Sequence, residues 1–142
     1  MTADQKTEPK TFDPAAHGWE LYTDEGFIGL VGPFWMRMEG DAPKFAFVMQ
    51  KKHHNRRGVL QGGMLMTFAD RALGRTVWQA AGRRVATIQF DMQFVSAGEL
   101  GEFIEIAPEV VRRTASLVFM RGTLISGERV VATCSGIWKI LD

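Results

Sequence analysis

The residues best suited to chemistry lie in one stretch, HHNRRGVLQGGMLMTFADRALG, at positions 53–74. Gly62 and Gly63 stand where a loop enters a predicted helix, so their backbone N–H groups are among the four that lack a helical partner. Without side chains in the way, a ligand oxygen can approach these amides closely. The positive end of the helix dipole would polarise a carbonyl group placed there, as in an oxyanion hole. The alternative is that the two glycines only form a tight turn.

Asp70 is the second candidate. It follows Gly62 by eight residues, which is about 12 Å at the rise of 1.5 Å per helical residue. A carboxylate beside an apolar stripe is paired, lies at a subunit interface or is functional. The structural alternative is a salt bridge to Arg71 or Arg75. Asp70 is too far from the amides of its own helix start to share one small substrate with them, so joint action requires a second subunit.

Other kinds of site find no support in the sequence. His53 and His54 are adjacent, with no paired Cys, HExxH or carboxylate cluster beside them, so we predict solvated loop histidines and no metal site. The GxxxxGK[ST] phosphate-binding loop and the G-x-S-x-G elbow of serine hydrolases are absent. The single cysteine, Cys134, excludes an intramolecular disulfide framework and a cysteine zinc site.

The composition is that of an ordinary globular protein. The chain has 142 residues, the size of one domain, and a net charge of +1, so nothing favours nucleic acid as a partner. No stretch approaches the ~20 apolar residues of a membrane span, so we expect no membrane association. Residues 1–16 are polar and lack the apolar run of a signal peptide. We therefore expect a disordered lead-in over 1–16, one domain over 17–142 and a cytoplasmic location.

One long helix carries the motif. From Gly62 to Ala81 apolar residues recur at intervals of three and four, which predicts an amphipathic helix, and Gly82 follows as a C-cap. The apolar stripe consists of Leu65, Phe68, Ala69, Ala72, Leu73, Thr76 and Ala80. We expect this stripe to supply much of the core. Four further aromatic residues are expected in the core, with an acyl pocket as the alternative: Phe34, Trp35, Trp78 and Phe94.

Strand-like segments flank this helix. Two precede it, at 26–40 and 43–50, after a turn or brief helix at 17–24. Four follow it, at 87–94, 102–111, 115–125 and 129–140. The first of these four alternates in polarity and has one wet or subunit-facing side. We predict an α+β fold in which a curved, mostly antiparallel sheet of five or six strands wraps around the long helix.

The motif resembles the hotdog-fold acyl-CoA thioesterases, in particular their phenylacetate-degradation (PaaI-like) branch. That branch carries an Asn, a Gly three residues on, a His-Gly-Gly and an Asp nine residues after the His. The matching positions here are Asn55, Gly58, Gln61-Gly62-Gly63 and Asp70, followed by Ala72 and Gly74 of the family's D-x-A-x-G ending. Thr87 corresponds to the family's Ser or Thr on the strand after the helix. The resemblance spans roughly residues 26–141 and implies a single hotdog domain.

The resemblance implies an acyl-CoA thioester hydrolase with its active site between two subunits. The Gly62 amide, with Gly63 beside it, would polarise the thioester carbonyl, and Asp70 of the facing subunit would act as nucleophile or general base. Asn55 would position the carbonyl or the attacking water, and Thr87 would hold water or orient the carboxylate. The resemblance also implies a homodimer or a dimer of dimers, and no cofactor beyond the coenzyme A of the substrate.

One departure from the family motif leaves an alternative function open. Gln61 stands where the branch has His, and it forms hydrogen bonds but takes no proton near neutral pH. The alternative is a hotdog protein that binds acyl-CoA or another ligand without turnover. A hotdog dehydratase is disfavoured because no acid–base His is placed for that reaction.

Coenzyme A also needs cations for its phosphates. We favour Arg112 and Arg113, at a predicted hairpin that would border the coenzyme A groove. The other candidates are Arg56, Arg57, Arg83 and Arg84.

Overall fold

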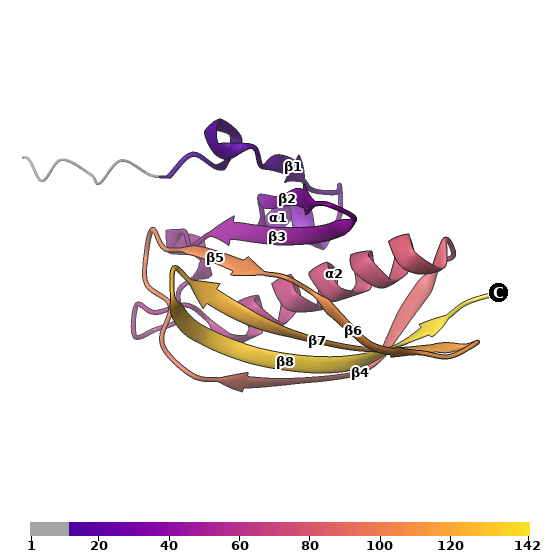
Figure 1. Cartoon of the computed structure of the whole chain (residues 1–142). Helices are drawn as coiled ribbons and strands as arrows, with labels where there is room; N and C mark the ends of the chain where they lie inside the picture. The colour runs from indigo at the N-terminus through magenta and orange to yellow at the C-terminus, as the bar shows by residue number, and fades with distance from the viewer. Residues whose placement is uncertain (1–11) are drawn as a thin grey trace, which may run out of the picture.

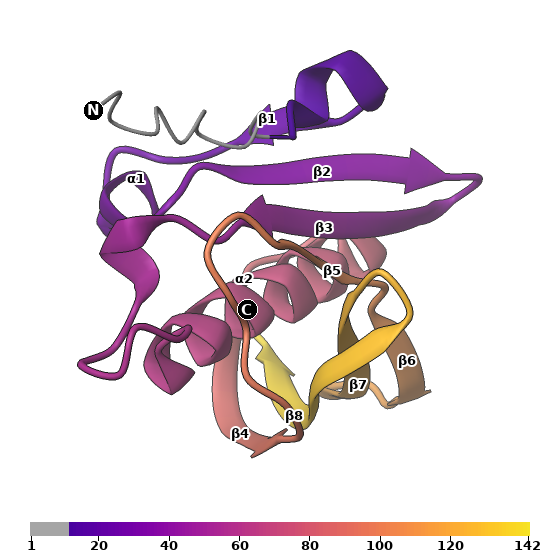
Figure 2. The same ribbon diagram turned by 90° about the vertical axis from the view of Figure 1, so that its left-hand side faces the viewer.

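A long helix lies in the hollow of one curved sheet. The computed structural model describes residues 12–142, and the first eleven residues of the predicted lead-in lie outside the described residues. In both views the sheet curls around helix α2 (Gly62–Ala81), with β2 (Phe34–Glu39) and β3 (Ala42–Val48) on one side of it and β4 (Val85–Phe94) and β8 (Arg129–Ile140) on the other (Figures 1 and 2). The predicted α+β arrangement is confirmed.

The remaining elements are short, apart from one long strand. They are η1 (Pro14–His17), β1 (Glu20–Tyr22), α1 (Phe27–Val31), η2 (Lys51–His53), β5 (Phe103–Ile106), β6 (Glu109–Arg113) and β7 (Leu117–Ser126). The strand order is β1-β2-β3-β5-β7-β8-β4, and β6 pairs with β7 beside this path. All of these pairings are antiparallel. None of the helices in the described part of the chain is long and apolar enough to cross a membrane.

Helix α2 keeps the predicted bounds because its apolar stripe is buried in the sheet. The ring centroid of Phe68 lies 5.2 Å from that of Phe34 and 4.7 Å from that of Phe47. Gly82 ends the helix with a left-handed φ of 65°, and its N–H donates to the Trp78 carbonyl. The buried helix residues are Met64, Leu65, Phe68, Ala69, Ala72, Leu73, Thr76 and Val77, whereas Ala80 is exposed.

The sheet has eight strands rather than the five or six predicted, and three local differences explain the count. The segment at 17–24 contains strand β1, which we did not predict. The segment at 102–111 is two strands, because Pro108 has no N–H to donate and separates β5 from β6. The apolar run at 26–40 begins as helix α1, and only its second half forms strand β2.

Two of the aromatic residues expected in the core lie at the surface. Phe34 is buried as predicted, but the side chains of Trp78 and Phe94 are 45% and 56% exposed. Phe94 is the last residue of β4, which pairs only with β8 and so forms one edge of the sheet. Ile88 on the same strand is also more than half exposed, next to a bulge that interrupts the pairing with β8. Strand β4 therefore presents an apolar edge.

Replacement of Gly136 by Ala should destabilise the fold. A Cβ at this position would lie 2.7 Å from the Gln89 carbonyl oxygen and 2.8 Å from the buried ring of Trp138. Because backbone must move to relieve this contact, we expect a loss of about 1–3 kcal/mol in the free energy of unfolding, measured by urea denaturation. The exposed neighbour Ser135→Ala is the control. Equal stability of the two variants would contradict this account of the packing.

Candidate active site

The start of helix α2 offers two backbone amides without partners. Gln61 is the N-cap residue, and its carbonyl accepts hydrogen bonds from the N–H groups of Met64 and Leu65 at 3.0 and 3.3 Å. The N–H groups of Gly62 and Gly63 donate to no other group within residues 12–142. A small acceptor such as a carbonyl oxygen can therefore bind there.

Gly62 packs closely against Phe94. A Cβ there would lie 3.0 Å from Cζ of Phe94, at the end of the edge strand β4. At Gly63 nothing lies within 4 Å of a Cβ, so the space beside its Cα is open. The two glycines therefore differ: Phe94 occupies the space beside Gly62, whereas the space beside Gly63 is empty.

Asn55 organises the loop that leads to the helix. Its Oδ1 accepts from the N–H groups of Arg57 at 2.8 Å and Val59 at 3.4 Å, and its carbonyl accepts from Gly58, whose φ is 80°. Its Nδ2 has no acceptor in the described part of the chain. Asn55 and Gly62 line the same cavity of about 420 Å³.

A second cavity of about 450 Å³ lies on the other side of the helix start. Short helix α1 and the first turns of α2 form its walls, and Gln61 and Gly63 border it. Its apolar lining consists of Phe27, Leu30, Val31 and Met64. Phe27 and Leu30 are 60% and 73% exposed. This cavity is suited to an apolar group next to a polar atom held by the Gly63 amide.

Asp70 is held by Thr87. The Thr87 hydroxyl, on β4, donates to Oδ1 of Asp70 at 2.7 Å. The expected structural alternative, a salt bridge from Asp70 to Arg71 or Arg75, is wrong. Arg71 pairs with Asp24 at 2.7 Å, and the Arg75 guanidinium lies 4.1 Å from the centroid of the Trp78 ring. Half-buried Asp70 is thus oriented by a hydroxyl and lines a small cavity of about 180 Å³.

The predicted site residues fall into two groups within one chain. The helix-start group, defined as Asn55, Gln61, Gly62 and Gly63, surrounds the free amides. Asp70 and Thr87 form the other group two helical turns further on, and none of the cavities described here contains residues of both.

Arg112 and Arg113 belong to neither group. Both are exposed on β6, and Nη1 of Arg113 donates to the Ala80 carbonyl at 3.0 Å. Ala80 lies in the last turn of α2, so Arg113 stands at the opposite end of the helix from Gly62.

His53 corrects the expectation of two solvated histidines. His54 is exposed, but His53 is only 2% exposed. Its Nδ1 accepts from the Gln50 N–H at 3.0 Å, its Nε2–H donates to the Val31 carbonyl at the end of α1, and its own carbonyl accepts from Gln61 N–H at 2.8 Å. Burial lowers the pKa of His53, which is consistent with a neutral ring. Two adjacent histidines in the sequence give no signal that distinguishes the buried one.

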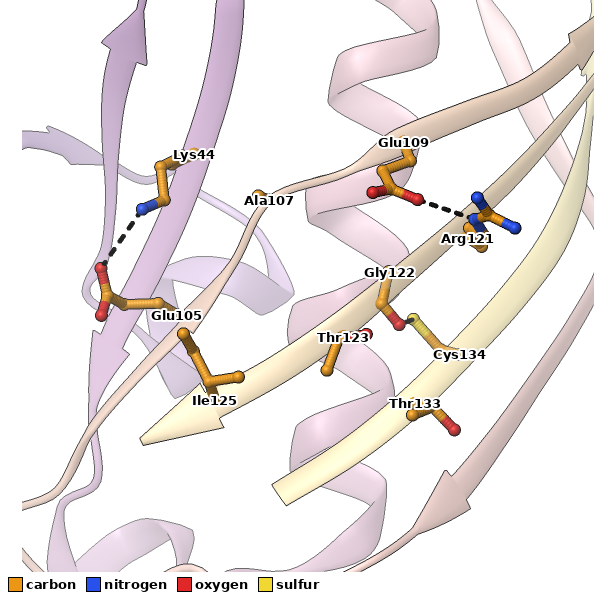
Figure 3. Close-up of a pocket in the computed structure, with 10 residues that line it drawn as sticks. All are labelled: Lys44, Glu105, Ala107, Glu109, Arg121, Gly122, Thr123, Ile125, Thr133 and Cys134. Atoms are coloured by element: carbon orange, nitrogen blue, oxygen red, sulfur yellow. Dashed lines mark hydrogen bonds and ion pairs between the residues drawn. The ribbon is translucent and has the colours of Figure 1, made fainter. Parts of the chain in front are cut away.

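A fourth hollow lies on the side of the sheet away from α2 (Figure 3). Its charged residues pair with one another, Lys44 with Glu105 at 3.9 Å and Arg121 with Glu109 at 2.7 Å. The Cys134 thiol at its floor donates to the Gly122 carbonyl, and burial raises its pKa to about 11. Within the described residues no group of three His, Cys, Asp or Glu side chains could hold a metal ion.

This architecture, a long helix wrapped by one curved antiparallel sheet, is the hotdog fold. The family model of the thioesterase superfamily matches residues 57–133, which is more than half of the chain. The protein belongs to this superfamily. The predicted resemblance to hotdog thioesterases is confirmed.

Relatives and solved structures agree with this assignment. A Pseudomonas aeruginosa protein named "Putative esterase PA0474" is 27% identical over 135 residues, covering 93% of this chain and 96% of the relative. A conserved P. aeruginosa protein has a similar structure, with a TM-score of 0.77 at 20% identity over 84% of this chain and 96% of that one. A Ralstonia eutropha "putative thioesterase, phenylacetic acid degradation-related protein" has a TM-score of 0.74 at 19% identity, covering 84% and 92%. A "hypothetical thioesterase protein" of Streptococcus pneumoniae, solved with coenzyme A, has a TM-score of 0.70 at 21% identity, covering 76% and 85%.

The buried His53 should make stability pH-dependent. Its native pKa lies below the ordinary value of 6.5, so below that pH the unfolded chain binds a proton that the native state excludes. The free energy of unfolding should therefore fall as the pH drops from 6.5 towards the native pKa. Urea denaturation should show a smaller pH slope for His53→Gln, and an unchanged slope for the exposed His54→Gln. The same slope in the wild type and His53→Gln would refute this role.

Proposed function

We propose that this protein is an acyl-CoA thioester hydrolase with each active site formed by two subunits. The observation that carries the proposal is that helix α2 displays both halves of such a site, free amides at Gly62 and Gly63 and a carboxylate, Asp70, oriented by Thr87. Membership of the thioesterase superfamily supports thioester chemistry. The structural neighbour solved with coenzyme A supports an acyl-CoA substrate.

The helix start would activate the thioester carbonyl. The Gly62 N–H would donate to the carbonyl oxygen, and Asn55, which lines the same cavity, would donate to it from Nδ2. Both groups are fixed before substrate binds, so they would stabilise the oxyanion of the tetrahedral intermediate without reorganisation. Gln61 borders this position and would supply a hydrogen bond, but no proton transfer at neutral pH.

Asp70 would promote attack on the thioester carbonyl in one of two ways. As a general base it would take a proton from water, which attacks the carbonyl and expels the coenzyme A thiolate. As a nucleophile it would itself attack, expel the thiolate and form an acyl-aspartyl anhydride that water hydrolyses. In either case Thr87 would fix the carboxylate through Oδ1, leaving Oδ2 to act.

A second subunit would bring the two halves together. Gly62 and Asp70 are eight residues apart on one helix, about 12 Å, which is too far for one thioester group. The edge strand β4 has no second neighbour within residues 12–142 and exposes Ile88 and Phe94. Because Phe94 also packs on Gly62, association through β4 would place a partner chain beside the helix start. We therefore propose a homodimer, alone or as half of a dimer of dimers.

Asp70→Asn should abolish hydrolysis while acyl-CoA binding persists. The amide can neither take the proton of water nor attack, so kcat should fall by about 10²-fold or more. Steady-state kinetics over a panel of aryl, short-chain and long-chain acyl-CoAs would measure this, with the exposed Asp91→Asn as control. Full activity of Asp70→Asn would remove Asp70 from the mechanism. Binding without turnover by the wild type across the panel would replace hydrolysis with the non-catalytic function.

The Gly62 amide can be tested by deletion of a single N–H. Pro is tolerated at the first helical position, and Gln61, with ψ of 130°, already has the backbone that precedes Pro. Gly62→Ala places the same Cβ against Phe94 but keeps the N–H. We therefore expect Gly62→Pro to lose about 10²-fold or more in kcat relative to Gly62→Ala.

Mixed dimers would then test the shared site. A dimer of one Asp70→Asn chain and one Gly62→Pro chain retains one intact site if each site draws on both subunits. Co-expression should therefore restore about a quarter of wild-type activity when the chains mix at random. If each variant is inactive alone and the purified mixed dimer is also inactive, the site does not span the subunits.

A further inference from the structure

We propose that Arg56 and Arg57 bind the phosphate groups of the coenzyme A part of the substrate. This inference rests on the proposed function, and it replaces the expectation that Arg112 and Arg113 do so. The turn from Lys51 to Arg57, here called the basic turn, is the structural basis of the proposal.

The charge of the chain is unevenly distributed around this turn. The whole sequence is nearly balanced, with 17 basic and 16 acidic side chains. Between positions 45 and 69, however, there is no Asp or Glu, while four Lys and Arg side chains occur. These are Lys51, Lys52, Arg56 and Arg57. The local excess of positive charge favours an anionic ligand.

Arg56 and Arg57 have no structural partners among the described residues, whereas most other arginines do. Arg37, Arg71, Arg83, Arg121 and Arg129 each pair with a carboxylate. The side chains of Arg56 and Arg57 are exposed and form neither an ion pair nor a hydrogen bond with the described residues. Two guanidinium groups held free on a surface are suited to bidentate contacts with phosphate oxygens.

Hydrogen bonds fix the backbone that carries Arg56 and Arg57. Asn55 Oδ1 accepts from the Arg57 N–H, and His54 and Leu60 form a bridge across the base of the turn. The carbonyl of His53 accepts from the Gln61 N–H, which fixes the turn to the helix start. Ordering a mobile loop on binding would cost conformational entropy, and much of this cost is avoided here.

The basic turn lies within reach of a substrate held at Gly62. Arg56 and Arg57, together with Gln61, line a surface hollow of about 670 Å³. Arg57 also lines the cavity that contains Gly62, so the two spaces lie next to each other. Arg56 precedes Gly62 by six positions, a span of at most about 20 Å. The pantetheine arm, which joins the thioester to the phosphates, is long and flexible and would cross this interval.

The test compares thioesters with and without phosphates. The variant is Arg56→Gln/Arg57→Gln, and the matched control is Arg84→Gln, another exposed arginine without an ion pair in the described chain, which lies beyond the far end of α2. For acyl-CoA we expect the double variant to raise KM by about tenfold or more with little change in kcat, as expected for lost charge-assisted hydrogen bonds. For the same acyl group on pantetheine, which has no phosphate groups, kcat/KM should match the wild type.

Three outcomes would overturn the proposal. One is an equal rise in KM for Arg84→Gln, and another is an equal loss on acyl-pantetheine, which would indicate damage to the helix start. Calorimetry with free coenzyme A separates this proposal from the proposed function, because it needs no turnover. If the wild type hydrolyses neither thioester, the proposed hydrolase function is wrong. The phosphate site would still be supported if the double variant binds coenzyme A more weakly than both the wild type and Arg84→Gln. Equal binding by all three proteins is the third overturning outcome.

Discussion

The burial of one face of helix α2 in the curl of the sheet is the constraint on which the rest of the structure depends. A helix of 20 residues in this position must direct its apolar stripe into the sheet, and Phe68 lies between Phe34 and Phe47 at the centre of that contact. The rotation of the helix about its axis is thereby fixed. Asp70 then falls at the border of the stripe, half-buried and within reach of Thr87 on β4. The placement of the carboxylate is a consequence of core packing.

The position of the helix start depends on contacts from two sides. On one side His53 connects helix α1 to the loop, through its ring to Val31 and through its carbonyl to Gln61. On the other side the Leu60 N–H donates to the Gly98 carbonyl. Each of these hydrogen bonds contributes about 0.5–1.5 kcal/mol, and loss of one would leave buried polar groups without partners. The free amides of the helix start are therefore held by residues that need not touch a ligand.

The loop that contains Gly98 is itself fixed by Arg129. Its Nη1 donates to the Ser96 hydroxyl at 2.7 Å and to the Ala97 carbonyl at 2.6 Å, and its Nη2 pairs with Glu102. Five other arginines also have structural partners, either a carboxylate or a helix carbonyl. They are Arg37, Arg71, Arg83, Arg113 and Arg121. Basic residues of identical type thus differ in availability to a ligand, and only their surroundings reveal which are free.

The sequence predicted the periodic elements well and the irregular ones poorly. Helix α2 and strand β8 have the predicted bounds, because each is long and its apolar period is sustained. Helix α1 lies in a segment predicted as a strand, since its four apolar residues are too few to show a period. The burial of His53 and the contact of Arg113 with Ala80 could not be predicted for a different reason, because burial and pairing depend on residues distant in sequence. Asp70 and Thr87 are 17 positions apart and form a hydrogen bond. This bond agrees with a role of Thr87 in orienting the carboxylate, which the family resemblance implied and the local sequence pattern did not.

The backbone geometry at Gln61 shows which properties of the site depend on having Gln in place of the family's His. The backbone of this residue fixes the helix start, since its carbonyl accepts from Met64 and Leu65 and its N–H donates to His53. Its side chain is exposed and makes no capping hydrogen bond. Any residue with the same extended backbone would hold the Gly62 amide in the same place. The presence of Gln at this position therefore bears on proton transfer and hydrogen bonding at the proposed substrate carbonyl, and not on the position of the amide.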